Sequence, residues 1–167
     1  MSNHRQSQIK AQLTAATAPI SATTLARKYT VSRQTIVGDI ALMRAQGEKI
    51  IATPRGYEYE RESIMEALVV CKHLPVDAVD EMRRIVRAGG VIKDVMIDHP
   101  LYGQLHGELQ IRTEADINMF IAKMRQHQGR MLSELTEGVH MHTIAYEKPE
   151  QLVAIKDTLR AASYLVE

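Results

Sequence analysis

Residues 21–60, SATTLARKYTVSRQTIVGDIALMRAQGEKIIATPRGYEYE, contain the pattern that decides the fold of the N-terminal part. Ser21 and Ser32 are favourable N-cap residues, and each is followed by apolar residues at helical spacing. Only the short segment Thr30-Val31 separates the two predicted helices. Two helices joined by so short a turn are typical of a helix-turn-helix, so the stretch predicts one.

The end of this stretch adds a β-hairpin. Residues 48–60 alternate apolar and polar side chains on both sides of TPRG, which predicts two strands joined by a Pro-Arg-Gly tip. A hairpin directly after the second helix of such a unit is a wing. A further helix is predicted at residues 5–16, before Pro19. We therefore expect a winged helix-turn-helix domain over residues 1–61.

The exposed positions of this domain suit DNA. The first turn of the helix after Ser32 is the part of such a unit that reads base edges in the major groove. Arginine can form two hydrogen bonds with guanine, and glutamine can form two with adenine. Basic residues at the hairpin suit contacts with phosphate. The predicted DNA-binding residues are Ser32, Arg33, Gln34, Thr35, Lys49 and Arg55.

The net charge of +1 conceals an uneven distribution. Residues 1–60 carry eight Lys and Arg against four Asp and Glu, whereas the remainder carries 13 against 16. A basic N-terminal part attached to a mildly acidic remainder suits a polyanionic partner. A small helical domain that binds another protein is the alternative. Helix spacing, exposed residues and charge together favour double-stranded DNA.

The composition indicates a folded protein of a reducing compartment. Hydrophobic residues make up 45% of the 167 residues, which is enough for a core and argues against wholesale disorder. The single cysteine, Cys71, excludes an internal disulfide. We find no signal-peptide pattern and no apolar run long enough to span a bilayer. A cytoplasmic protein with no membrane partner is therefore expected.

The pattern changes after the predicted hairpin. Strand-like and helix-like segments alternate over residues 62–167 in the order β-α-β-β-α-β-α. This order predicts an α+β domain, a small sandwich with helices on one face of a mostly antiparallel sheet. The predicted strands are 65–72, 91–98, 104–112 and 138–147, and the predicted helices are 75–90, 113–129 and 148–166.

Seven histidines is a high number for a chain of this length. His140 and His142 form an H-x-H pair, and residues two apart on a strand point to the same face. His73 ends another strand, and Glu81 lies in the helix that follows it. Together these three histidines and one glutamate would suit Zn²⁺, Ni²⁺, Fe²⁺ or Mn²⁺ as metal ligands. An exposed strand face and a solvated helix residue are the alternative explanation. Asp98-His99 likewise suits either a pocket or a turn.

Taken together, the motifs resemble those of the nicotinate-responsive transcription repressors that combine a winged helix with a three-histidine (3H) domain. The resemblance covers nearly the whole chain. It is carried by LARKYTVSRQTIVGDIALMRAQG, TPRGYEY, the KH of CKHLP, RAGGVIKDVMIDHPLYG and EGVHMHTI. It implies a divalent metal held by His73, Glu81, His140 and His142, and it makes residues 62–167 the 3H regulatory domain.

The resemblance also implies that nicotinate is the co-repressor, that a DNA operator is the target, and that genes for niacin uptake or NAD synthesis are regulated. A homodimer is expected from the way such proteins bind DNA. The ligand-binding residues proposed at this stage are Lys72, Arg87, His99 and Tyr102. Three alternatives share the sequence pattern: a repressor that senses the metal itself, a metal-dependent enzyme attached to a DNA-binding module, and a purely structural metal site.

Overall fold

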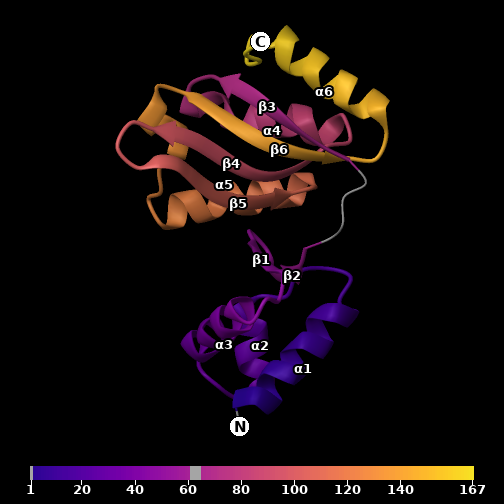
Figure 1. The fold of residues 1–167 in the computed structure, drawn as a ribbon, viewed down its shortest axis with the longest axis vertical. Helices are drawn as coiled ribbons and strands as arrows, with labels where there is room; N and C mark the ends of the chain where they lie inside the picture. The colour runs from indigo at the N-terminus through magenta and orange to yellow at the C-terminus, as the bar shows by residue number, and fades with distance from the viewer. Residues whose placement is uncertain (1, 61–64) are drawn as a thin grey trace. The chain divides into compact units, whose positions relative to one another are not determined.

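The computed structural model describes residues 2–60 and 65–167 and divides the chain into two compact units, Met1–Arg61 and Glu62–Glu167 (Figure 1). The first unit combines helices with a two-stranded hairpin, and the second combines helices with a four-stranded sheet. Each unit has a hydrophobic core of its own. The α+β class predicted from the sequence is confirmed.

The first unit is a helix-turn-helix followed by a hairpin. Both predicted caps are confirmed: Ser21 Oγ accepts the N–H of Thr24 at 3.0 Å, and Ser32 Oγ accepts the N–H of Thr35 at 3.0 Å. Thr30 adopts the left-handed conformation, with φ of 54°, and closes the turn between the helices. The elements are α1 (Ser2–Ala15), α2 (Ala22–Tyr29), α3 (Arg33–Ala45), β1 (Ile50–Thr53) and β2 (Gly56–Tyr59).

Long-range contacts hold the hairpin and the first helix against the helix-turn-helix. The N–H of Ile20 donates to the Tyr57 carbonyl at 2.9 Å, and the N–H of Tyr57 donates back at 2.8 Å. Gly56, with φ of +139°, lies so close that a Cβ atom there would collide with the Ile20 backbone. On the other side, Arg5 Nε donates to the buried Asp39 carboxylate at 2.5 Å. The wing and α1 are thus parts of one folded unit.

The second unit is built on an antiparallel sheet with strand order β3-β6-β4-β5. Consecutive strands are not always neighbours, because β6 lies between β3 and β4. The predicted element order is confirmed. The elements are β3 (Met65–Lys72), α4 (Ala78–Arg87), β4 (Val91–His99), β5 (Gly103–Ile111), α5 (Glu114–Gln126), β6 (Val139–Tyr146) and α6 (Pro149–Ala161).

The helices of this unit pack on the sheet through one core (Figure 1). Ile85 of α4, Ile117 of α5 and Ile155 of α6 are fully buried, as are Ile92 and Ile144 of the two central strands. Thr113 begins α5 with a capping box, which confirms its predicted role as N-cap. The same helix-covered side of the sheet carries the histidine residues described below.

Two short 3-10 helices were missed by the sequence analysis. One, Pro75–Asp77, occupies the first turn of the segment predicted to be a single helix. The other, Leu132–Thr136, lies between α5 and β6. Single turns of this kind are too short to produce a recognisable hydrophobic period. Within the described parts of the chain, no helix is both long and apolar enough to cross a membrane.

Candidate metal centre and nucleic-acid interface

Strand β6 places two imidazoles on the helix-covered face of the sheet. His140 and His142 are 4% and 3% exposed, so the predicted alternative of an exposed strand face does not apply to them. Their neighbours across the β3–β6 pairing are Cys71 and Val69, which are also buried. His73 follows two residues after Cys71, and its side chain is 3% exposed. The antiparallel register therefore brings two histidines of β6 and one that follows β3 to one place.

Helix α4 supplies a carboxylate to the same place. Glu81 is 1% exposed, so it is not a solvated helix residue. Its Oε1 lies 2.5 Å from His142 Nε2, and its Oε2 lies 3.0 Å from His140 Nε2. The Nε2 atom of His73 also contacts Oε2. Three of the residues that the sequence singled out as metal ligands, all histidines, thus converge on the carboxylate of the fourth, Glu81.

The opposite ring nitrogen of each histidine is anchored to the backbone. His73 Nδ1 donates to the Leu74 carbonyl at 2.8 Å, and His140 Nδ1 donates to the Gly138 carbonyl at 2.8 Å. His142 Nδ1 donates to the Asp94 carbonyl at 2.6 Å. A carbonyl only accepts, so each Nδ1 carries the proton. In a neutral ring, the lone pair of Nε2 then points toward Glu81, as in metal sites with supporting carbonyls.

Two irregularities of the backbone make these anchors possible. The pairing of β4 shifts register between Ile92 and Met96, which frees the Asp94 carbonyl for His142. Gly138 has φ of +93°, and a Cβ atom there would collide with the His73 carbonyl. Glycine at this position lets the start of β6 approach the end of β3. The sequence analysis identified neither Asp94 nor Gly138 as part of the site.

The chemistry of the donor set suits a bound cation. Three neutral Nε2 atoms and an ionised carboxylate are all hydrogen-bond acceptors, so they repel one another unless protons or a metal lie between them. Burial opposes the charge of Glu81, but the adjacent His142 and His140 outweigh it and hold the pKa of Glu81 well below 4.5. Burial also opposes charge on His142, yet Glu81 raises the pKa of His142 above 6.5. The residues present therefore fit a divalent metal.

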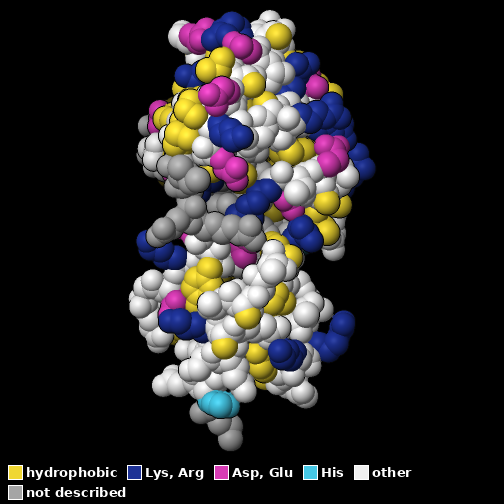
Figure 2. All heavy atoms as spheres, turned by 90° about the vertical axis from the view of Figure 1, so that its right-hand side faces the viewer, with side chains coloured by type: hydrophobic (Ala, Val, Ile, Leu, Met, Phe, Trp, Pro, Cys, Tyr) yellow, Lys and Arg dark blue, Asp and Glu magenta, His cyan; other side chains and the backbone are white. Residues whose placement is uncertain are grey.

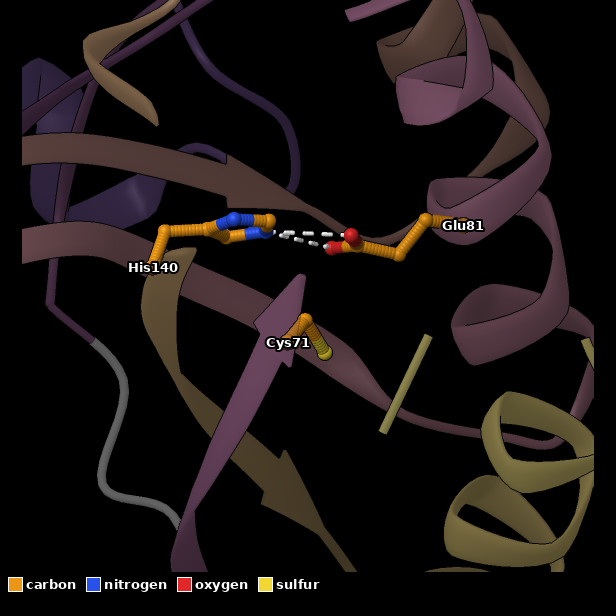
Figure 3. Close-up of side chains that lie close together, drawn as sticks. All are labelled: Cys71, Glu81 and His140. Carbon is orange, nitrogen blue, oxygen red and sulfur yellow. Dashed lines mark hydrogen bonds and ion pairs between the residues drawn. The ribbon is translucent and has the colours of Figure 1, made fainter. Parts of the chain in front are cut away.

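Cys71 is a further residue beside the cluster that the sequence analysis did not consider as a ligand. Its Sγ, a Glu81 oxygen and a His140 nitrogen all lie within 4.8 Å of one another, and all three residues are buried. Figure 3 shows Glu81 reaching from α4 to His140, with Cys71 next to them on β3. Burial is the main cause that raises the pKa of the Cys71 thiol well above 9.0, and the negative charge of Glu81 raises this pKa further. The two-residue spacing to His73 was the available signal.

A cavity of about 260 Å³ adjoins the four residues. This is slightly smaller than the roughly 300–1,000 Å³ of pockets for drug-sized ligands, so it suits a molecule with one ring. Most of its wall is apolar and comes from β4, β5, α4, α5 and the segment before β6. The apolar residues are Ala78, Met82, Val95, Leu109, Phe120, Met124, Met131 and Leu132, and the polar ones besides the cluster are Glu108, Arg130 and Ser133.

None of the four ligand-binding residues proposed from the sequence lines this cavity. Lys72 and Arg87 are exposed at the ends of β3 and α4. His99 Nδ1 accepts the N–H groups of Leu101 and Tyr102 at 3.1 and 3.3 Å. The rings of His99 and Tyr102 stack with their centroids 4.9 Å apart. The Asp98-His99 pattern is therefore turn chemistry at the β4–β5 hairpin, and the structure does not bring these residues to the metal centre.

The predicted DNA-binding residues lie on the first unit. Arg33 and Gln34 are exposed on the first turn of α3, and neither makes a side-chain hydrogen bond within the described parts of the chain. The hydroxyl groups of Ser32 and Thr35 instead form a hydrogen bond with each other, 2.8 Å between Oγ and Oγ1, and stabilise the start of the helix. Lys49 and Arg55 are exposed at the hairpin. The charged side chains of this unit seen in Figure 2 are mainly basic, whereas both signs are mixed on the second unit.

The metal-free centre is expected to make the stability of the second unit depend on pH. The lowered pKa of Glu81 contributes stability above pH 4.5 that is lost as the pH falls. The raised pKa of His142 contributes stability below pH 6.5 that is lost as the pH rises through the raised value. Urea unfolding of chelator-treated protein should therefore show a maximum between these values, and Zn²⁺ should move it to higher pH. Identical pH profiles with and without Zn²⁺ would contradict this.

Comparison with known proteins identifies the family. Residues 66–167 match the 3H domain, and residues 5–58 match an HTH domain. The chain is 34% identical over 172 residues to the "Transcription repressor NadR" of Bacillus subtilis, an alignment that covers 100% of this chain and 96% of the relative. It is 38% identical over 150 residues to the "Probable transcription repressor NiaR" of Thermotoga maritima, which covers 89% and 86%. The chain therefore belongs to the NadR and NiaR type of transcription repressor, a DNA-binding regulator and not an enzyme, with an HTH domain followed by a 3H domain.

Proposed function

We propose that this repressor uses a divalent metal to sense nicotinate and controls genes for niacin uptake or NAD synthesis. The observation that carries the proposal is the cluster of His73, Glu81, His140 and His142 beside a mostly apolar cavity. Imidazole and carboxylate donors suit Zn²⁺, Ni²⁺, Fe²⁺ or Mn²⁺. Four protein ligands leave a position open on a metal that accepts five or six.

The residues of the cavity have separate roles in this proposal. The anchored imidazoles and Glu81 would hold the metal, which supplies a Lewis acid for a carboxylate oxygen or a pyridine nitrogen when bound. The apolar side chains of Val95, Leu109 and Phe120 would exclude water and pack against the pyridine ring. The backbone anchors keep the rings in place, so little ordering is needed when ligand arrives. The apolar wall favours an organic ligand over sensing of the metal alone.

Regulation would follow from a difference in affinity. Nicotinate can favour DNA binding only if it binds the DNA-competent form of the protein more tightly than the other form. We propose a homodimer whose two recognition helices contact successive major grooves, about 34–36 Å apart. The ligand would stabilise the dimer in the arrangement with this spacing. Nicotinate and operator DNA would then raise each other's affinity by the same factor.

Calorimetry with nicotinate tests the proposal. We expect nicotinate to bind the full-length protein loaded with Zn²⁺ or Ni²⁺ and not the chelator-treated protein, because the metal holds one polar end of the ligand. Affinity for DNA selected in vitro should rise with nicotinate only in the metal-loaded protein. Circular dichroism of the chelated sample serves as the control for folding.

The possible outcomes separate the alternatives. Equal nicotinate affinity with and without metal would remove the metal from ligand recognition. DNA affinity that follows the metal concentration with no organic ligand would indicate a metal sensor. Unfolding of the second unit on chelation would indicate a structural metal.

A further inference from the structure

The cavity wall contains a cationic side chain that the metal centre does not use. Arg130 is the only lysine or arginine among the described residues that line the cavity. Its guanidinium makes no hydrogen bond or ion pair within the described parts of the chain. By contrast, Arg83 pairs with Glu114 at 2.5 Å and Arg84 pairs with Asp80 at 2.7 Å. Arg130 is exposed at the cavity wall, so its donors meet solvent and no group of the described chain, and they are available to an anion that enters the cavity.

The backbone on both sides of Arg130 is held in place. The N–H of Gly129 donates to the Met124 carbonyl at the end of α5, at 2.8 Å. The N–H of Met131 donates to the Glu134 carboxylate at 2.8 Å. Met124 and Met131 themselves line the cavity. The base of the arginine is thus fixed at the cavity wall, while its charged end is free to form new hydrogen bonds.

We infer that Arg130 binds the carboxylate of a small aromatic acid in this cavity and makes the site selective for the acid over its amide. The inference rests on the proposed function. A planar guanidinium presents paired N–H donors that match the two oxygens of a carboxylate. A carboxamide offers one acceptor oxygen, and its NH₂ group would face further donors. Glu108, the acidic residue of the wall outside the metal cluster, already has an interaction of its own in the chain.

This assignment divides the ligand between two parts of the site. The apolar wall contacts the ring, and Arg130 binds the carboxylate. The pyridine nitrogen remains, and it is an aromatic lone-pair donor like the imidazole nitrogens of the cluster. Specificity for an acid with a ring nitrogen then comes from two polar contacts in a mostly apolar cavity. An amide, or an acid without a ring nitrogen, would lose one of the two contacts.

Calorimetry of metal-loaded, full-length variants tests the inference. Arg130→Gln should weaken the affinity for nicotinate by about 10- to 100-fold, which corresponds to the loss of hydrogen bonds to a charged group. Nicotinamide affinity should change much less, because the amide does not use the guanidinium charge. Arg130→Lys keeps the charge without the paired donors and should lie between wild type and Arg130→Gln. Arg125→Gln, an exposed change on α5 outside the cavity wall, is the matched control.

The outcomes distinguish this inference from the proposed function. If Arg130→Gln binds nicotinate as wild type does, or loses acid and amide affinity equally, the assignment of Arg130 is wrong and the metal-dependent sensing of nicotinate stands. If wild type binds no nicotinate, a panel of benzoate and pyridine carboxylates is titrated instead. Loss of the bound acid in Arg130→Gln would then support Arg130 and reject nicotinate. Binding of no acid by wild type would overturn both.

Discussion

Replacing Glu81 is expected to weaken metal binding strongly at the proposed metal centre of the second unit. Glu81 is the one carboxylate that all three histidines of the cluster face, and it is 1% exposed. Glu81→Ala should lower metal affinity by more than the roughly 10- to 100-fold that loss of a supporting hydrogen bond costs. Competition with a chromophoric chelator measures this affinity. If the site is the sensor, nicotinate-dependent DNA binding should disappear in the same variant.

The design must separate loss of a ligand from loss of the fold. Glu81→Ala leaves the Nε2 atoms of three buried imidazoles without the carboxylate they face, so the variant could unfold for that reason alone. Glu81→Gln has nearly the same shape and its NH₂ group can donate to an Nε2 atom, so it should remain folded while its neutral amide binds metal weakly. Glu150→Ala, on the exposed first turn of α6, is the control. A folded Glu81→Gln variant with wild-type metal affinity would exclude Glu81 as a ligand.

Replacing Arg33 is expected to weaken sequence-specific DNA binding and to leave the fold intact. Arg33 is exposed at the start of α3 and makes no hydrogen bond or ion pair within the described residues, so its loss breaks no internal contact. A paired contact with one base is worth about 1–3 kcal/mol, which predicts a loss of roughly 5- to 150-fold for the specific site. Binding to random DNA should fall far less.

The control for Arg33 must remove the same charge. Arg27 is an exposed arginine on the neighbouring helix α2. Arg27→Ala should weaken binding to the specific site and to random DNA by similar factors. Both variants are compared by fluorescence anisotropy at one salt concentration, because phosphate contacts depend steeply on salt. Retention of full specificity by Arg33→Ala would assign base reading to other residues of α3, of which Gln34 is the next exposed one.

The local structure of this protein was determined by short segments of sequence. The caps at Ser21, Ser32 and Thr113 were predictable because a hydroxyl side chain satisfies N–H groups only two or three residues away. The hairpin was predictable from alternation around TPRG, and the common face of His140 and His142 from the period of a strand. These features depend on neighbours along the chain, so the sequence alone was enough for them.

The candidate metal centre depends on contacts between distant segments. The β3–β6 register, the register shift at Asp94 and the packing of α4 together bring Glu81 to His140 and His142, about 60 residues away. No short pattern encodes such a distance. The sequence analysis grouped these residues as a possible metal set, but an exposed strand face and a solvated helix residue explained them as well until the family resemblance favoured the set. The same holds for Cys71 and Arg130, which became candidates through their place beside the cluster and its cavity. Local hydrogen bonding determined the helices, caps and turns, whereas tertiary packing decided which side chains share a site.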